Sequence, residues 1–276
     1  MFFNSLLERF IIIAIADTIK TTGLRAVREA GLILKEGFGK PRQISYKGAI
    51  NLVTEMDQRS EALIIDILSR EFPDYGILAE ESAEQKGNGS GRWIIDPLDG
   101  TTNYAHGYPF FCISLALEDN GKIVWGAVYD PLREELFSAE SGGGATVNGT
   151  PLAVSKTDSL GSGFLSTGFP YDVRESAEDN VLHFSRFAKC ARAIRRDGSA
   201  ALDLCYVAMG RFDGFWEPKL HPWDTAAGSL IVIESGGSVT DYSGSPFFLD
   251  SREILATNGL IHQEMIDVLT KDTFQQ

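Results

Sequence analysis

Two aspartates three residues apart distinguish the segment WIIDPLDGTTNYAHGYPF, which runs from residue 93 to residue 110. The apolar run before them predicts a short buried strand that delivers Asp96 at its end. Pro97 fixes the backbone φ angle and, because it lacks an N–H, ends sheet pairing there. Asp96 and Asp99 can then converge on one point, as carboxylate ligands of a divalent metal ion must.

The residues after this pair favour an anion beside that point. Gly100 permits a close backbone approach, and the amides of Thr101 and Thr102 would face an anion if a helix begins here. The segment therefore suits a divalent metal beside a phosphate group. Asp-Pro-X-Asp-Gly is also a good turn sequence, so the segment taken alone leaves both interpretations open.

Further acidic positions favour the metal interpretation. Residues 57–71 carry apolar side chains at helical spacing, and residues 76–79 then predict a buried strand that ends in Glu80 and Glu81. Asp224 lies in the first turn of a predicted helix over residues 223–237. Each position also has a simple structural interpretation, because glutamates often occupy solvated strand ends and an aspartate stabilises the start of a helix.

The composition is that of a globular protein. The chain has 276 residues, 43% hydrophobic and 23% charged, enough for one large core or two tightly packed halves. The net charge of −13 argues against a general binder of nucleic acid or anionic membranes. Cys112, Cys190 and Cys205 are an odd number with no Cys-X-X-Cys pair, each in an apolar setting. We expect reduced core cysteines in a cytoplasmic protein.

An apolar run near the N-terminus, residues 10–16, superficially resembles the end of a signal peptide. No basic cluster precedes it, and seven apolar residues are too few to span a membrane. We expect instead an extended, partly amphipathic first helix whose second part, residues 24–38, packs on the core.

The pattern of predicted elements changes near residue 160. Before it come helices at about 17–38 and 57–71 and an antiparallel meander of strands at 112–118, 123–130, 135–140 and 145–148. After it strands alternate with helices, at 164–167, about 175–191, 193–195, 199–212 and 214–217, before the Asp224 helix. We expect an α/β protein, α+β in its first half, with a soft boundary between halves 1–160 and 161–276.

These motifs, in this order, resemble the inositol monophosphatase family, within a superfamily that includes fructose bisphosphatases and nucleotide and inositol polyphosphate phosphatases. The resemblance runs from about Thr54 to Gly259. It implies a layered αβαβα sandwich of the sugar phosphatase type, a homodimer, and an active site between the halves. Its motifs are Glu80-Glu81, D-P-L-D-G-T with the following Tyr104 and His106, and W-D-T-A-A-G ending at Gly236-Gly237.

The resemblance implies two magnesium ions and a weaker third near Glu80. Carboxylate and carbonyl oxygens, without an obvious set of histidines and cysteines, suit magnesium better than zinc. Glu80, Asp96 and the carbonyl of Leu98 would hold one ion. Asp96, Asp99 and Asp224 would hold a second, and Asp96 would bridge the two.

In the family a threonine and an aspartate activate the attacking water, which sits on the metal ion held by the residue matching Glu80. The matching pair is Thr101 and Asp57, although Asp57 also suits a helix cap. Glu81 would orient Thr101 or a bound water. Gly100, Thr101 and Thr102 would bind the phosphate.

Substrate contacts are implied in the second half. Gly198, Ser199 and Ala200 match the substrate loop that opens a helix, and Glu217 matches the family's acidic partner for ring hydroxyls. Arg195 and Arg196 could bind a second phosphate, but we expect them to face solvent, another subunit or Asp197. Lys47 matches a basic residue that in the family acts through water near the first metal site. His106 and His221 lie next to the motifs and are expected to be structural.

We therefore expect a phosphoric monoester hydrolase that releases inositol and phosphate from inositol monophosphate with magnesium and is sensitive to lithium. Fructose 1,6-bisphosphate, nucleotide 3′-phosphate and histidinol phosphate stay open as substrates, because specificity lies in a few loop residues. A partner-binding protein without catalysis is the alternative from another class. The complete carboxylate set gives it no support.

Overall fold

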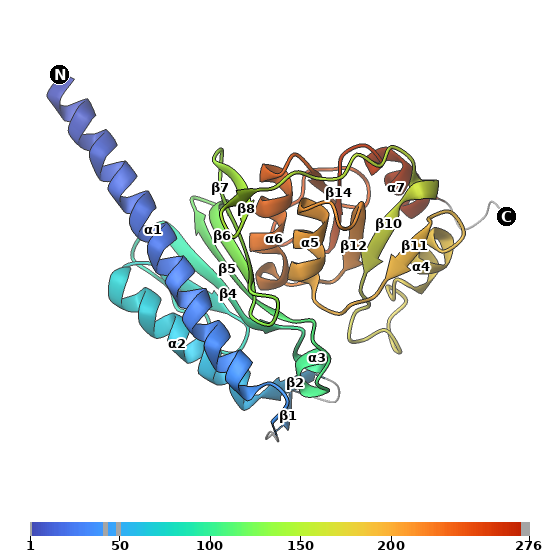
Figure 1. Ribbon diagram of the computed structural model, residues 1–276, viewed down its shortest axis with the longest axis horizontal. Coiled ribbons are helices and arrows are strands. Elements are labelled where there is room, and N and C mark those ends of the chain that lie inside the picture. Colours follow the sequence, from blue (N-terminus) through green and yellow to red (C-terminus); the bar gives the residue numbers. More distant parts are fainter. Residues whose placement is uncertain (1, 41–43, 48–50, 272–276) are drawn as a thin grey trace.

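Helices and sheets alternate in five layers, as Figure 1 shows. This computed structural model describes residues 2–40, 44–47 and 51–271, with side chains for residues 16–40 and 54–271. The order of layers is helix pair, seven-stranded sheet, helix pair, five-stranded sheet, helix pair. The expected αβαβα sandwich is confirmed.

Helices α1 (Phe2–Gly37) and α2 (Glu55–Glu71) form the first layer. They cover a mixed sheet whose spatial order is β3-β4-β5-β6-β7-β8-β9, in which β3 and β4 are parallel and the other neighbours antiparallel. The predicted meander therefore corresponds to β5 through β8. The strands are β3 (Gly76–Ala79), β4 (Gly91–Asp99), β5 (Cys112–Asp119), β6 (Lys122–Asp130), β7 (Glu135–Glu140), β8 (Gly144–Val147) and β9 (Thr150–Pro151).

Strand β4 is buried on both faces because helices cover both sides of this sheet. Trp93 and Ile95 pack in the apolar cluster under α1 and α2. Ile94, which points to the opposite face, packs in the cluster shared with the middle helices. The carboxylates at the end of β4 are thus held by a strand that has no exposed face.

The middle layer consists of α5 (Ala200–Ala208) and α6 (Pro222–Glu234). Every residue of α5 is buried, and α6 contacts strands of both sheets. A helix with sheets on two sides must be apolar nearly all round, and small residues let its backbone lie close to both. These two helices of the second half therefore join it to the first.

The second sheet has the order β11-β10-β12-β14-β13 and is covered on its outer face by α4 (Val181–Phe187) and α7 (His262–Leu269). Its strands are β10 (Phe164–Thr167), β11 (Ala193–Arg195), β12 (Gly214–Pro218), β13 (Ser238–Thr240) and β14 (Glu253–Thr257). The remaining elements are the β1 (Ile44–Lys47) and β2 (Asn51–Thr54) hairpin, α3 (Thr101–Ala105) and the 3₁₀ turn Leu160–Ser162. The proposed boundary near residue 160 falls between the two large sheets.

Some predicted boundaries were wrong. The helix expected at 175–191 is only α4, because Asn180 adopts a left-handed backbone with φ 67°. The helix expected at 199–212 ends at Ala208, before Gly210 with φ 72°. Pro97 does not end the pairing of β4, which resumes at Asp99 opposite Cys112 after a shift of register.

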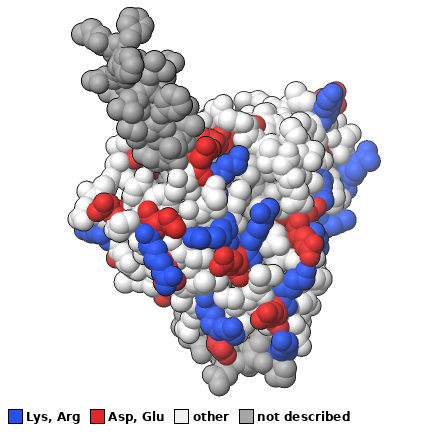
Figure 2. All heavy atoms as spheres, turned by 60° about the vertical axis from the view of Figure 1, so that its left-hand side comes forward, with Lys and Arg blue, Asp and Glu red and all other residues white. Residues whose placement is uncertain are grey.

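Charged side chains of both signs are interspersed on the face that α1 and α2 cover (Figure 2). Several form ion pairs, such as Arg70 with Asp66 at 2.7 Å and Lys35 with Glu134 at 2.6 Å. None of the helices in the described ranges is both long enough and apolar enough to cross a bilayer.

Candidate active site

Asp96, Asp99 and Asp224 lie together, with one carboxylate oxygen of each within 4.8 Å of those of the other two. The first two come from β4 and the third from the first turn of α6. The register shift at Pro97 gives β4 the irregularity that lets two aspartates three residues apart reach one point. The three residues that were expected to share a metal ion are thus brought together.

Hydrogen bonds orient one oxygen of each carboxylate. Asp96 Oδ1 accepts the amide N–H of Leu98 at 3.0 Å, and Asp224 Oδ2 accepts that of His221 at 2.6 Å. Asp99 Oδ2 accepts from the Ser199 hydroxyl at 2.6 Å and from the Ala201 amide at 2.8 Å. The other oxygen of each accepts no hydrogen bond within the part of the chain that the structure describes. One ligand atom per residue is therefore free for a cation.

The carboxylates of the cluster repel one another when they are ionised. Burial, then repulsion by Glu80, Asp99 and Asp224, raises the pKa of Asp96 well above its usual range. Burial and Asp99 raise the pKa of Asp224 to about 7. No cation in the described ranges offsets these shifts. Crowded carboxylates of this kind ionise together only beside a positive ion, and their all-oxygen donor set fits magnesium.

A pocket of about 190 Å³ opens over the cluster. Glu80, which follows the end of β3, lines this pocket together with Leu98. The residues expected to hold the first metal ion therefore border the same pocket as those expected to hold the second. The amide of Glu80 donates to the Ile95 carbonyl, which extends the β3–β4 pairing up to the pocket.

Asp57 and Thr101 form a buried pair, of which Thr101 lines the pocket. The Thr101 hydroxyl lies 3.0 Å from Asp57 Oδ1 and 3.0 Å from the Leu98 carbonyl oxygen, so it can donate to either. Asp57 Oδ2 accepts from the amide and hydroxyl of Thr54, at 2.8 and 2.5 Å. Thr54 is the N-cap of α2, and Asp57, the third residue of the helix, completes the capping box while its other oxygen faces Thr101. The helix begins at Glu55, two residues earlier than predicted, so Asp57 does not open it.

Helix α3 begins at Thr101, which meets the condition set for an anion site at the Thr101 and Thr102 amides. Its cap, Gly100, has φ 96°, and a side chain there would come within 2.9 Å of the Phe110 carbonyl oxygen. Only glycine fits this turn without strain. Thr101 is buried and Thr102 is exposed.

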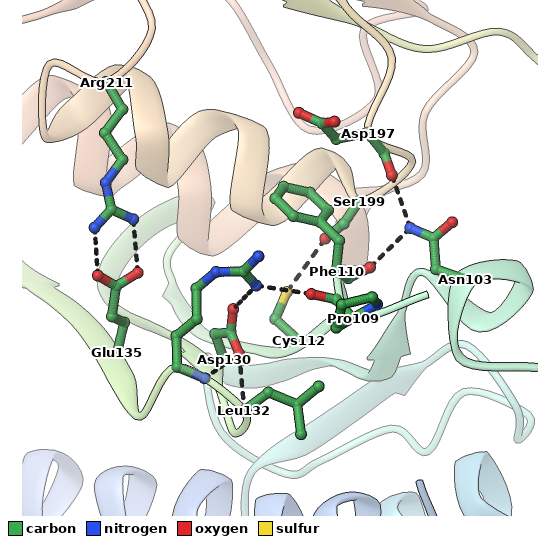
Figure 3. Close-up of polar contacts among 11 residues, drawn as sticks. Asn103, Pro109, Phe110, Cys112, Asp130, Leu132, Glu135, Asp197, Ser199 and Arg211 are labelled. Carbon is green, nitrogen blue, oxygen red and sulfur yellow. Dashed lines mark hydrogen bonds and ion pairs between the residues drawn. The ribbon is translucent and has the colours of Figure 1, made fainter. Parts of the chain in front are cut away.

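The loop at Gly198 comes from the second half but is tied to α3. Figure 3 shows Asn103 donating to the backbone carbonyls of Phe110 and Asp197, both at 2.7 Å. The Ser199 hydroxyl is bonded to Asp99, and Ala200 begins α5. The loop therefore lies beside the carboxylate cluster, with Gly198 in a left-handed conformation, φ 84°.

Glu217, on β12, is half-buried and faces the same region. Burial, Asp224 and Asp99 raise the pKa of Glu217 to about 8, against the opposing effect of the nearby Arg196 guanidinium. At neutral pH its carboxyl therefore holds a proton before any cation or substrate binds. Arg195 instead lies over the Phe164 ring, 4.8 Å from its centroid.

The sequence did not indicate Tyr171 or Asn103. Tyr171 lines the carboxylate pocket from the segment between β10 and α4, and only its place after a predicted strand end could have drawn attention to it. Asn103 directly follows the Gly-Thr-Thr motif, and its sequence context is that of an ordinary helix residue.

The expected role of Glu81 in orienting Thr101 or a bound water stays a prediction. The Thr101 hydroxyl lies within hydrogen-bond distance of Asp57 and Leu98, and the Glu81 amide donates to Glu61. The Lys47 side chain lies outside the described side chains. His221 stacks on Trp223 at the pocket wall, and His106 is an exposed residue at the end of α3. Cys190 is exposed, so the expectation of a core residue was wrong there, whereas Cys112 and Cys205 are buried.

Fold and site together define a layered α/β protein with an acidic, metal-type pocket between its halves. A sequence model of the inositol monophosphatase family matches residues 16–273. The chain belongs to this family of phosphatases.

Individual members of the family match this chain over most of their length. The chain is 47% identical over 255 residues to an inositol-1-monophosphatase of Synechocystis sp., covering 91% of this chain and 89% of the relative. It is 41% identical over 247 residues to the Nus factor SuhB of Escherichia coli, covering 88% and 92%. The solved structure of inositol monophosphatase from Anabaena superposes with a TM-score of 0.85 at 42% identity, covering 93% and 96%.

Proposed function

We propose that this protein hydrolyses inositol monophosphate to inositol and phosphate with magnesium. The observation that carries the proposal is the cluster of Asp96, Asp99 and Asp224, each with one oriented and one unbonded oxygen, in a pocket shared with Glu80. Family membership supports the substrate class, and the oxygen donors support the metal.

The residues divide the work of the reaction. Glu80, Asp96, the Leu98 carbonyl, Asp99 and Asp224 would hold the magnesium ions. Bound there, magnesium would neutralise charge on the phosphate oxygens and acidify a water.

Thr101 and Asp57 move the proton. When Thr101 donates to Asp57, its oxygen is left as the acceptor for a proton of the attacking water. Burial raises the pKa of Asp57, which strengthens it as a proton acceptor at the end of this chain of hydrogen bonds. The α3 amides at Thr101 and Thr102 then face the phosphate, and Gly198, Ser199, Ala200 and Glu217 border the alcohol.

The alternatives differ in their requirements at the alcohol end. A bisphosphate needs a cation for its distal phosphate, and the exposed Arg196 is the candidate. A partner-binding role without catalysis has support only in the name Nus factor SuhB that several relatives carry, and it gives no reason for three crowded, mutually repelling carboxylates. Inositol monophosphate matches the acidic Glu217, which suits ring hydroxyls.

We include three properties in the same proposal, from family resemblance and composition: a homodimer, a cytoplasmic location and sensitivity to lithium. The three cysteines, all within the described ranges, are unpaired, which supports the location. Lithium at tens of millimolar, roughly where a weak monovalent site fills, should reduce turnover.

The test is release of phosphate from inositol 1-phosphate by purified protein during a magnesium titration that begins in EDTA. We expect no turnover above the blank in EDTA and saturable activation by magnesium. Equal rates with and without the ion would contradict the proposed role of the carboxylates.

A further inference from the structure

Tyr171 stands at the mouth of the carboxylate pocket. It lines the pocket together with Glu80, Asp96, Asp99 and Asp224, yet 58% of its surface is exposed. The segment that carries it joins β10 to α4 and lies at the same end of the molecule as α3 in Figure 1. An aromatic side chain in this place is not part of the hydrophobic core.

The base of this segment is fixed by a buried asparagine. Asn180 Nδ2 donates to the Gly168 carbonyl at 2.6 Å and to Thr167 Oγ1 at 2.9 Å, and its Oδ1 accepts from Trp216 Nε1 at 2.8 Å. Asn180 takes the left-handed conformation that asparagine tolerates better than most residues. The start of the segment is therefore held against β12.

The middle of the segment is held by Lys219, the residue that follows β12. Lys219 Nζ lies 2.8 Å from Asp172 Oδ2 and donates to Ser176 Oγ at 2.7 Å. Lys219 itself has φ 60°, a conformation that costs a non-glycine residue free energy and persists only where its surroundings hold it. Phe169, Pro170 and Tyr171 thus lie between two fixed points.

The segment also borders Glu217. A Cβ atom built on Gly168 would lie 2.1 Å from Glu217 Oε1, so this glycine leaves the room that the carboxyl occupies. Lys219 follows Glu217 by two residues. The segment therefore borders Glu217 through Gly168 and the carboxylate pocket through Tyr171.

We propose that Tyr171 is a specificity-determining residue that contacts the alcohol half of the substrate, its ring against the carbon skeleton of a cyclic polyol and its hydroxyl on a ring hydroxyl. This rests on the function proposed above. A phenol hydroxyl is protonated at neutral pH, so it can donate this hydrogen bond. Because the segment that carries Tyr171 is already held in place, little conformational entropy is lost when substrate binds.

The test compares Tyr171→Ala and Tyr171→Phe on inositol 1-phosphate and on ethyl phosphate, whose alcohol has no ring. Tyr171→Ala should lower kcat/KM for inositol 1-phosphate about tenfold, mainly through KM, and change it less than about twofold for ethyl phosphate. Tyr171→Phe should lose about threefold on the inositol ester alone. Tyr108→Ala, at another exposed tyrosine, is the matched control and should behave as wild type.

Asp172→Asn tests the fixed segment. It weakens the ion pair with Lys219 without touching the pocket, and should raise KM for inositol 1-phosphate about threefold with kcat unchanged. A fall in kcat on both substrates, in the Tyr171 variants or in Asp172→Asn, would overturn the proposal, because that result would indicate a loss of function where the phosphate binds.

Calorimetric binding of inositol 1-phosphate separates this proposal from the proposed function. Wild type that binds the ester about tenfold more tightly than Tyr171→Ala, but does not hydrolyse it, would support the role of Tyr171 and contradict the function. Equal affinities, equal losses on both substrates, or no binding by wild type would overturn the role of Tyr171.

Discussion

The two ends of the pocket are built differently. At the metal end, Asp96, Asp99 and Thr101 lie within six residues of one another on a buried strand and the helix after it, and α6 adds Asp224. At the proposed alcohol end, Tyr171, Gly198 and Glu217 come from three separate segments of the second half. If the proposed function holds, the reaction depends mainly on one compact motif, whereas substrate choice depends on how distant segments are held together.

The largest expected effect breaks the metal end. Asp96→Asn removes a charge while nearly keeping the volume, and should lower kcat by at least about a thousandfold in saturating magnesium. Folding should survive, because Asp96 is a source of repulsion in the metal-free protein. Steady-state kinetics with circular dichroism test this. Asp66→Asn, at an exposed ion pair on α2, is the control.

A smaller effect is expected at the proton path. Thr101→Ala removes the hydroxyl between Asp57 and the attacking water, and should lower kcat about a hundredfold with little change in KM. The α2 cap should stay intact because it uses the other oxygen of Asp57. Thr150→Ala, at an exposed position of β9, is the matched substitution. Turnover within twofold of wild type in Thr101→Ala would exclude this proton path.

At the alcohol end, Glu217→Gln should lower kcat/KM for inositol 1-phosphate about tenfold, the scale of one charged hydrogen bond. Arg196→Ala should matter little on this substrate. If a bisphosphate is the true substrate, the arginine is the costlier loss. Measuring both variants on inositol 1-phosphate and fructose 1,6-bisphosphate decides the matter, and a large loss confined to Arg196→Ala on the bisphosphate would reverse our choice.

The smallest expected effect is on stability against pH. In EDTA the folded protein keeps protons on Asp224 and Glu217, with pKa values of about 7 and 8, that the unfolded chain has already released. Stability from these groups is complete below the ordinary carboxyl pKa and is lost as pH rises through 7 and 8. The melting temperature should fall by a few degrees, roughly, between pH 6 and 8.5 in EDTA.

Magnesium should flatten this dependence, because a bound cation stabilises the ionised carboxylates. Asp224→Asn should flatten it in EDTA as well. Melting curves that rise with pH in EDTA would show that the cluster is not protonated in the folded protein.

The clustering of Asp96, Asp99 and Asp224 was predictable from the sequence because these residues follow one strand and one helix start. Periodicity marked the buried strand before Asp96, and turn residues marked Gly100. What it could not show is that β4 continues past Pro97, because the shifted pairing depends on β5 lying alongside.

The alcohol end was less predictable for a physical reason. The left-handed Asn180 shortens the expected helix 175–191 so that its side chain can hold Thr167, Gly168 and Trp216 together. Such contacts between residues far apart in the chain leave no periodic signal. No sequence pattern accordingly pointed to Tyr171, and Glu217 was identified only through family resemblance.

The most direct test of the account is the ratio of kcat/KM for inositol 1-phosphate to that for fructose 1,6-bisphosphate, measured on wild type in saturating magnesium and again in EDTA. We predict a preference for the inositol ester of about tenfold or more, with both activities lost in EDTA. Equal or better use of the bisphosphate, or hydrolysis that persists in EDTA, would contradict the proposal of a magnesium-dependent inositol monophosphatase.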